Sequence, residues 1–83
     1  MNPEEAKARA QALLNVIETS YAIRIVNVEE VVVAITEKTR DEQKILAICT
    51  ALNTWVALNT GLSGEVEIPL DFVNGILENV MGL

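Results

Sequence analysis

Residues Thr39–Gly61, TRDEQKILAICTALNTWVALNTG, carry the strongest structural signal in this chain. Thr39 and Glu42 have the spacing of a helix capping box, and Gly61 stands where a C-terminal cap belongs. Apolar residues recur between them at helical spacing and form one arc. The members of this arc are Ile45, Ile48, Cys49, Leu52, Trp55 and Val56. The sequence therefore predicts a helix over 40–60.

This helix is expected to lie at the centre of the protein, because no charged residue stands between Ile45 and Gly64. From Ile45 to Leu58 it rises only about 21 Å, less than the roughly 30 Å of a bilayer's hydrocarbon core. Threonines and asparagines also interrupt it, so we expect no membrane span. Leu46 and Leu58 point away from the apolar arc on opposite flanks. A chain of 83 residues has little else to cover them, which favours self-association.

The first helix is predicted over 3–21. Asn2 is a suitable N-cap, Pro3 suits the first helical position, and Glu5 is placed for an i,i+4 pair with Arg9. The apolar positions recur at helical spacing. They are Ala6, Ala10, Leu13, Leu14, Ile17 and Tyr21.

Residues 22–38 allow two interpretations. Val31, Val32 and Val33 are β-branched and favour a strand intrinsically. The spacing of the apolar residues over the whole segment instead fits one face of a helix over 28–38, with Asn27 as its cap, and we favour this helix. Val33 then points outward, where it is either ordinary surface or part of a contact.

The segment after Ser63 begins with a weak alternation that suggests a short strand. If residues 65–68 are extended, residues 23–26 are their natural partner, with Arg24 facing Glu65 or Glu67. A last helix is predicted over 69–81 and stops at Gly82. Its apolar face comprises Leu70, Val73, Ile76, Leu77, Val80 and Met81. Asn74-Gly75 is a hairpin dipeptide when strands flank it, but the flanking residues do not alternate.

The expected fold is all-α. It is a single helical domain over 1–83 with four helices, and the pairing of 23–26 with 65–68 is an optional addition.

Composition excludes several classes of function. The chain has no histidine, and its net charge is −6. Without imidazole there is no Ser-His-Asp or Cys-His site, and Cys49 falls on the apolar arc as a small buried hydrophobe. No calcium-loop or phosphate-loop spacing occurs, so we expect no metal and no cofactor. All six basic residues lie within the first 44 positions, which disfavours direct nucleic-acid binding.

These features predict a non-enzymatic, cytoplasmic protein-interaction module, such as a small accessory regulator or inhibitor. It would bind a protein partner, a second copy of itself, or both. Two other functions stay open: an acidic mimic that occupies a nucleic-acid site on its target, and a structural subunit of a larger assembly. The candidate interface residues are Leu46, Trp55, Leu58 and Val33.

Overall fold

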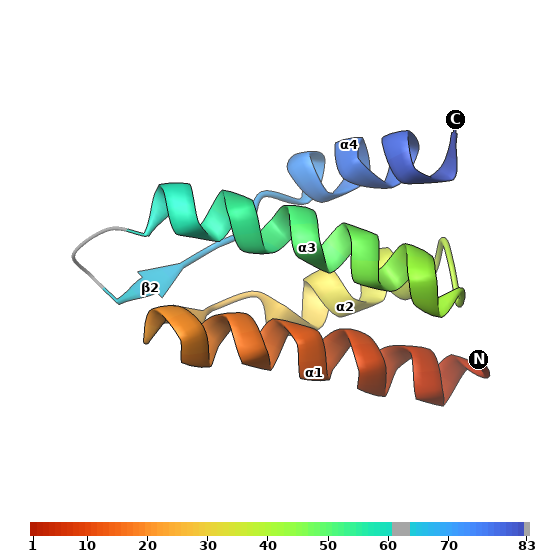
Figure 1. The fold of residues 1–83 in the computed structure, drawn as a ribbon, viewed down its shortest axis with the longest axis horizontal. Helices are drawn as coiled ribbons and strands as arrows, with labels where there is room; N and C mark the ends of the chain where they lie inside the picture. The colour runs from red at the N-terminus through yellow and green to blue at the C-terminus, as the bar shows by residue number, and fades with distance from the viewer. Residues whose placement is uncertain (61–63, 83) are drawn as a thin grey trace.

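The computed structural model describes residues 1–60 and 64–82 and confirms the all-α class (Figure 1). The four helices are α1 (Pro3–Tyr21), α2 (Val28–Thr36), α3 (Glu42–Asn59) and α4 (Leu70–Met81). Two short strands join them, β1 (Arg24–Ile25) between α1 and α2 and β2 (Glu65–Val66) between α3 and α4. Each half of the described chain is therefore a helix, a strand and a helix.

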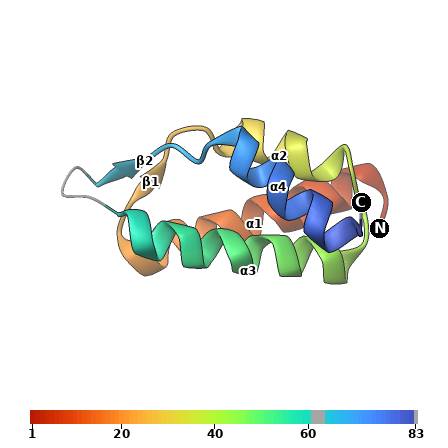
Figure 2. The same cartoon turned by 90° about the horizontal axis from the view of Figure 1, so that it is seen from above.

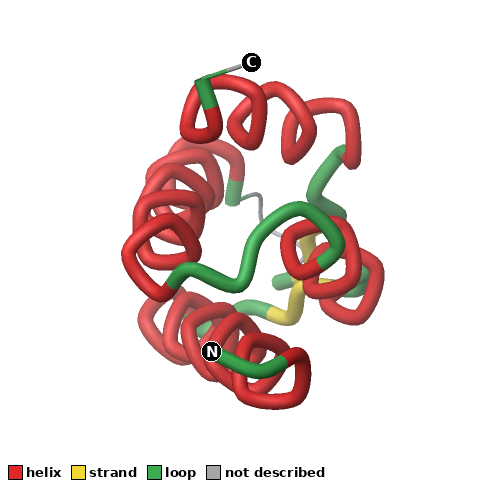
Figure 3. Tube along the Cα trace, turned by 90° about the vertical axis from the view of Figure 1, so that its right-hand side faces the viewer, coloured by secondary structure: helices red, strands yellow, loops and turns green. Residues whose placement is uncertain are grey.

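The two halves lie side by side in the same orientation. Helices α1 and α3 run in one direction, whereas α2 and α4 return in the other (Figures 1 and 2). Helix α1 packs against α2 and α3, and α4 packs against the same two helices (Figure 3). This arrangement places the α1–α3 seam and the α2–α4 seam on opposite sides of the molecule.

The helices enclose one apolar core. It is built by small and branched residues at helical spacing from all four helices, together with Ile25 and Ile68. Its largest fully buried side chains are Leu14, Val31, Ile35, Ile45, Ile48, Leu52, Val56, Ile68 and Val73. Burying Val31, Val32 and Ile35 together explains why residues 28–36 are helical despite their β-branched side chains, since tertiary packing outweighs intrinsic propensity. Asn74-Gly75 lies inside α4, as the apolar spacing predicted.

The predicted strand pairing is present and parallel, and it is shorter than the predicted stretches. Arg24 pairs with Glu65 and Ile25 with Val66. The Arg24 guanidinium Nη1 lies 2.8 Å from Glu65 Oε2, so the predicted charge pair forms across the strands. The parallel direction follows from the fold, because both strands leave the same ends of parallel helices (Figure 2).

Asn27 is the N-cap residue of α2, as predicted, but its side chain extends the strand pairing and does not bond to the helix. Its Nδ2 donates to the carbonyl oxygen of Ile68 at 2.7 Å, and its Oδ1 accepts from the backbone N–H of Ile68 at 2.9 Å. It makes no side-chain capping bond to α2. Asn27 and Ile68 are both buried, so these two hydrogen bonds satisfy a backbone N–H and a backbone carbonyl that water cannot reach. The two halves are thus joined where their second helices begin.

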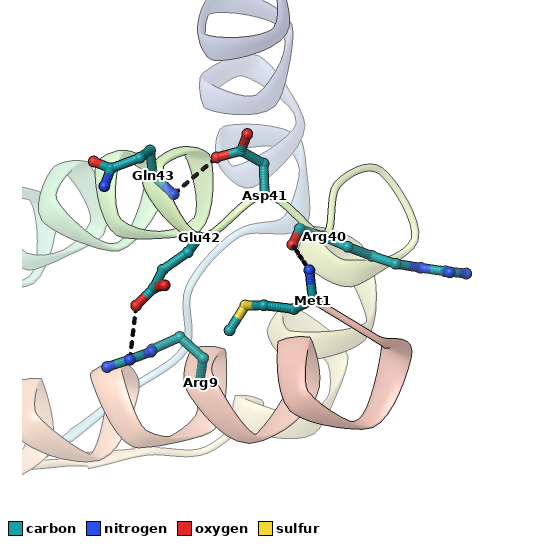
Figure 4. Close-up of polar contacts among 6 residues, drawn as sticks. All are labelled: Met1, Arg9, Arg40, Asp41, Glu42 and Gln43. Atoms are coloured by element: carbon teal, nitrogen blue, oxygen red, sulfur yellow. Dashed lines mark hydrogen bonds and ion pairs between the residues drawn. The ribbon is translucent and has the colours of Figure 1, made fainter.

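The structure confirms some of the predicted helix caps and not others. Asn2 and Glu5 form a capping box at α1, and Gly82 ends α4 in the left-handed conformation. The cap of α3 is Asp41, whose Oδ1 accepts from the backbone of Gln43 at 2.8 Å, so the predicted Thr39–Glu42 box is wrong (Figure 4). The predicted cap Gly61 lies outside the described residues.

The start of α3 is held against α1 by polar contacts. Arg9 Nη2 lies 2.7 Å from Glu42 Oε1, so Arg9 reaches across to α3 and not along α1 to Glu5 (Figure 4). The amino group of Met1 donates to the carbonyl oxygen of Arg40 at 3.3 Å. Glu42 is free to pair with Arg9 because Asp41 has taken over the capping role.

Candidate functional site: an uncharged ridge on helix α3

The solvent face of α3 forms an uncharged ridge between α1 and α4. We define the α3 ridge as Leu46, Ala47, Thr50, Ala51, Asn53, Thr54, Trp55, Ala57 and Leu58. All are exposed or partly exposed, and none carries a charge. Figure 1 looks onto this side of the molecule, with α3 across the middle. An exposed helix face without charges is atypical of a solvated surface, which normally carries charged residues on the side away from the core.

Leu46 lies on the α1 flank of the ridge. It lines a shallow groove with Leu13 and Val16 of α1 and Asn53 of α3. Val16 is 60% exposed and Leu46 47% exposed, so the two branched side chains present apolar surface from neighbouring helices. Sequence reasoning did not identify Val16, because it is off the core stripe of α1 and only the packing of α1 beside α3 brings it to Leu46.

Trp55 lies on the other flank, against α4. Its ring centroid is 5.7 Å from that of Phe72, with the ring planes tilted by 34°. Trp55 is partly buried, and Phe72 is 36% exposed. Phe72 was also missed, since it falls outside the predicted apolar face of its helix. Aromatic pairs at this separation attract each other and fix the edge of the ridge.

Leu58 lies near the C-terminal end of the ridge and is its most exposed large apolar residue, at 81%. Ala47, Ala51 and Thr54 precede it at helical spacing, so a row of small side chains lies on the same face of α3 as Leu58. Leu46, Trp55 and Leu58 therefore share the exposed surface of one helix. Leu46 and Trp55 lie on opposite flanks of this surface, beside α1 and α4 respectively.

Val33 does not belong to this surface. It lies on α2 and lines a separate groove with Leu70 of α4. Val33 is 44% exposed, as its outward position predicted. Leu70, at the start of the predicted apolar face of α4, is 37% exposed, whereas Val73, Ile76 and Leu77 on that face are buried.

The reactive side chains of the described residues are few. Cys49 is buried in the core, and burial raises the pKa of its thiol to about 11. A protonated, inaccessible thiol is a poor nucleophile. Within residues 1–60 and 64–82, no three side chains of metal-ligating type gather closely enough to hold an ion. Every buried side-chain nitrogen or oxygen in the same residues has a hydrogen-bond partner.

Comparison with known proteins gives no assignment. No protein-family model matches the chain, and neither a curated protein nor a solved structure matches it significantly. Among the described residues, no helix combines the length and the apolar character that crossing a bilayer requires. The candidate site is thus defined by its geometry and composition.

Proposed function

We propose that this protein is a non-enzymatic interaction module that forms a homodimer through the α3 ridge. The observation that carries the proposal is the uncharged, apolar surface around Leu46 and Leu58, widened by Val16 on one flank and Phe72 on the other. Excluding water from the exposed parts of Leu46 and Leu58 would stabilise association by about 1–2 kcal/mol for each residue.

Charge supports self-association at this surface. Two copies that each carry a net charge of −6 repel each other at most approaches. The ridge holds no charged side chain, so two copies meet there with the least like-charge repulsion. Charged residues occur at its edge, where Arg9 and Glu42 already neutralise each other. Such an interface has an uncharged centre and a polar rim, as interfaces between proteins commonly do.

The ridge lies on the broad side of the molecule. The molecule measures 36 by 24 Å along its two longer axes, and this is the side that carries the ridge (Figure 1). A stable interface needs about 800 Å² from each partner. An interface of that size would have to extend from the ridge over nearly the whole of this side, with Trp55 and Phe72 as aromatic anchors of the kind that dominate binding energy.

The acidic-mimic alternative receives less support. A mimic needs an array of carboxylates that are available to a basic target. Of the twelve acidic residues, five already accept a hydrogen bond or form an ion pair within the described part of the chain. These are Glu5, Glu18, Asp41, Glu42 and Glu65.

Three charge-matched variants test the proposal. We expect Leu46→Lys and Leu58→Lys to weaken self-association at least about ten-fold, because each places a charge in the apolar seam. Val33→Lys makes the same charge change on the opposite side and is expected to leave the solution mass unchanged. The readout is molar mass by light scattering over a concentration series, with circular dichroism to confirm folding. An equal effect of Leu58→Lys and Val33→Lys on the mass is incompatible with the proposed seam.

A further inference from the structure

A second exposed surface lies between α2 and α4, on the side of the bundle opposite the α3 ridge. A hollow of about 450 Å³ is lined there by Val33, Ala34 and Leu70, together with Glu29, Glu30 and Glu37. A second hollow is lined by Lys38, just beyond the end of α2, and by Asn74, Leu77, Glu78 and Met81 of α4. We call the two hollows together the α2–α4 groove.

The floor of this groove is apolar and open to solvent. Val33 and Leu70 are 44% and 37% exposed, and Ala34 between them is partly exposed. Met81 continues the apolar floor toward the ends of the helices. Exposed apolar surface in a concave site is typical of a place where a partner docks.

The rim is acidic. Four carboxylates and one amine line the groove, namely those of Glu29, Glu30, Glu37, Glu78 and Lys38. The ion pairs found in residues 1–60 and 64–82 are Arg9–Glu42 and Arg24–Glu65, and neither involves this rim. The three carboxylates beside Val33 all come from α2, and Glu78 of α4 lines the second hollow together with Lys38. The negative field is therefore concentrated along the α2 side of the apolar floor.

A second copy of this chain is a poor occupant, because it is itself acidic and its uncharged surface is the α3 ridge. The complementary occupant has apolar side chains for the floor and cations for the rim. Helix α4 of 12 residues is about 18 Å long, which corresponds to about three turns of a bound helix. An amphipathic helix offers this pattern, with apolar residues at i, i+3 or i+4, and i+7 and basic residues on its flanks.

We propose that the α2–α4 groove binds a short, basic amphipathic helix of another protein. Its apolar face contacts Val33, Ala34 and Leu70, and its lysine or arginine side chains pair with Glu29, Glu30 and Glu37. This interaction goes beyond the proposed homodimer and does not depend on it, since it uses the opposite side of the molecule.

The test is a titration of the ¹⁵N-labelled protein with a synthetic peptide of about 14 residues. Leucines stand at i, i+4 and i+7 of this probe, lysines stand beside them, and alanines fill the remaining positions. A scrambled peptide of identical composition controls for charge alone. We expect amide shift changes to concentrate in residues 28–37 and 70–81. Shift changes spread over α1 and α3, equal binding of the scrambled peptide, or no binding at low salt would each overturn the proposal.

Substitutions locate the site independently. Val33→Lys is expected to weaken binding of the probe at least about ten-fold, whereas Leu58→Lys, with the same charge change, leaves it unchanged. The double variant Glu30→Gln/Glu37→Gln keeps the apolar floor and is expected to weaken binding about two- to ten-fold at low salt, with the difference shrinking as salt is added. Equal affinity of the Val33→Lys and Leu58→Lys proteins, or no effect of the double variant, would argue against the groove.

Discussion

The two hydrogen bonds between Asn27 and Ile68 are expected to be among the polar interactions that contribute most to the stability of the protein. Replacing Asn27 with alanine removes both bonds and leaves the N–H and the carbonyl of Ile68 buried without a partner. Stranding a buried peptide group costs about 1–3 kcal/mol for each donor or acceptor. The substitution should therefore lower the free energy of unfolding by about 2–6 kcal/mol.

This loss is large for so small a protein. A domain of 83 residues has a total stability of roughly 4–12 kcal/mol, so Asn27→Ala would remove a substantial share of it. The assay is urea denaturation followed by circular dichroism, combined with hydrogen exchange at the amide of Ile68. That amide is expected to lose much of its protection in the variant, since its acceptor is gone.

Two further variants separate polar from packing effects. Asn27→Asp keeps the size of the side chain but sets a carboxylate oxygen against the carbonyl of Ile68, so it should also destabilise strongly at neutral pH. Asn74→Ala removes an exposed asparagine from α4 and should change stability by less than about 0.5 kcal/mol. If Asn27→Ala costs no more than Asn74→Ala, the role assigned to this side chain is wrong.

Three other perturbations follow from the structure. Ala22 ends α1 at φ 52°, so Ala22→Val should cost about 1–2 kcal/mol in urea denaturation and Ala22→Gly should cost nothing. Cys49 stays protonated in the folded state while the unfolded thiol ionises near pH 9, so up to about 3 kcal/mol of stability is lost between pH 9 and 11. Thermal unfolding of Cys49→Ala should lack this decline. Arg24→Ala breaks an exposed ion pair with Glu65 and should cost under about 1 kcal/mol in the same urea assay.

The helices were predictable from sequence because each buries a regular apolar stripe. Even the ambiguous segment around Val31 follows this rule, since only the helix buries Val31, Val32 and Ile35 together. The strand pairing was predictable in position from the alternation around Val66. Its parallel direction was not, because direction depends on how the two halves of the chain pack.

Polar side chains near helix ends were predicted less well. Thr39 and Asp41 both have residue types that cap helices, and sequence spacing alone favoured the wrong one. Asn27 stands at the position of a cap but bonds to Ile68, which is 41 positions away in the chain. Arg9 likewise pairs with a residue of another helix. Choices between a local and a distant partner depend on the tertiary fold, which no short pattern records.

The sequence predicted only those parts of the candidate surfaces that lie on one helix. Leu46 and Leu58 could be identified as exposed from the periodicity of α3 alone. Their neighbours Val16 and Phe72 come from other helices, so they required the packing of α1 and α4 beside α3. The same packing assigns Val33 to the α2–α4 groove, where acidic residues surround it.

The most direct measurement is the molar mass of the wild-type protein by sedimentation equilibrium, from micromolar to millimolar concentration. The proposed homodimer predicts that the mass rises from the 9.1 kDa of one chain to twice that value. Added salt should not weaken the dimer, because the seam is apolar and salt screens the repulsion between two copies of net charge −6. A mass of one chain at every concentration would show that the α3 ridge does not join two copies.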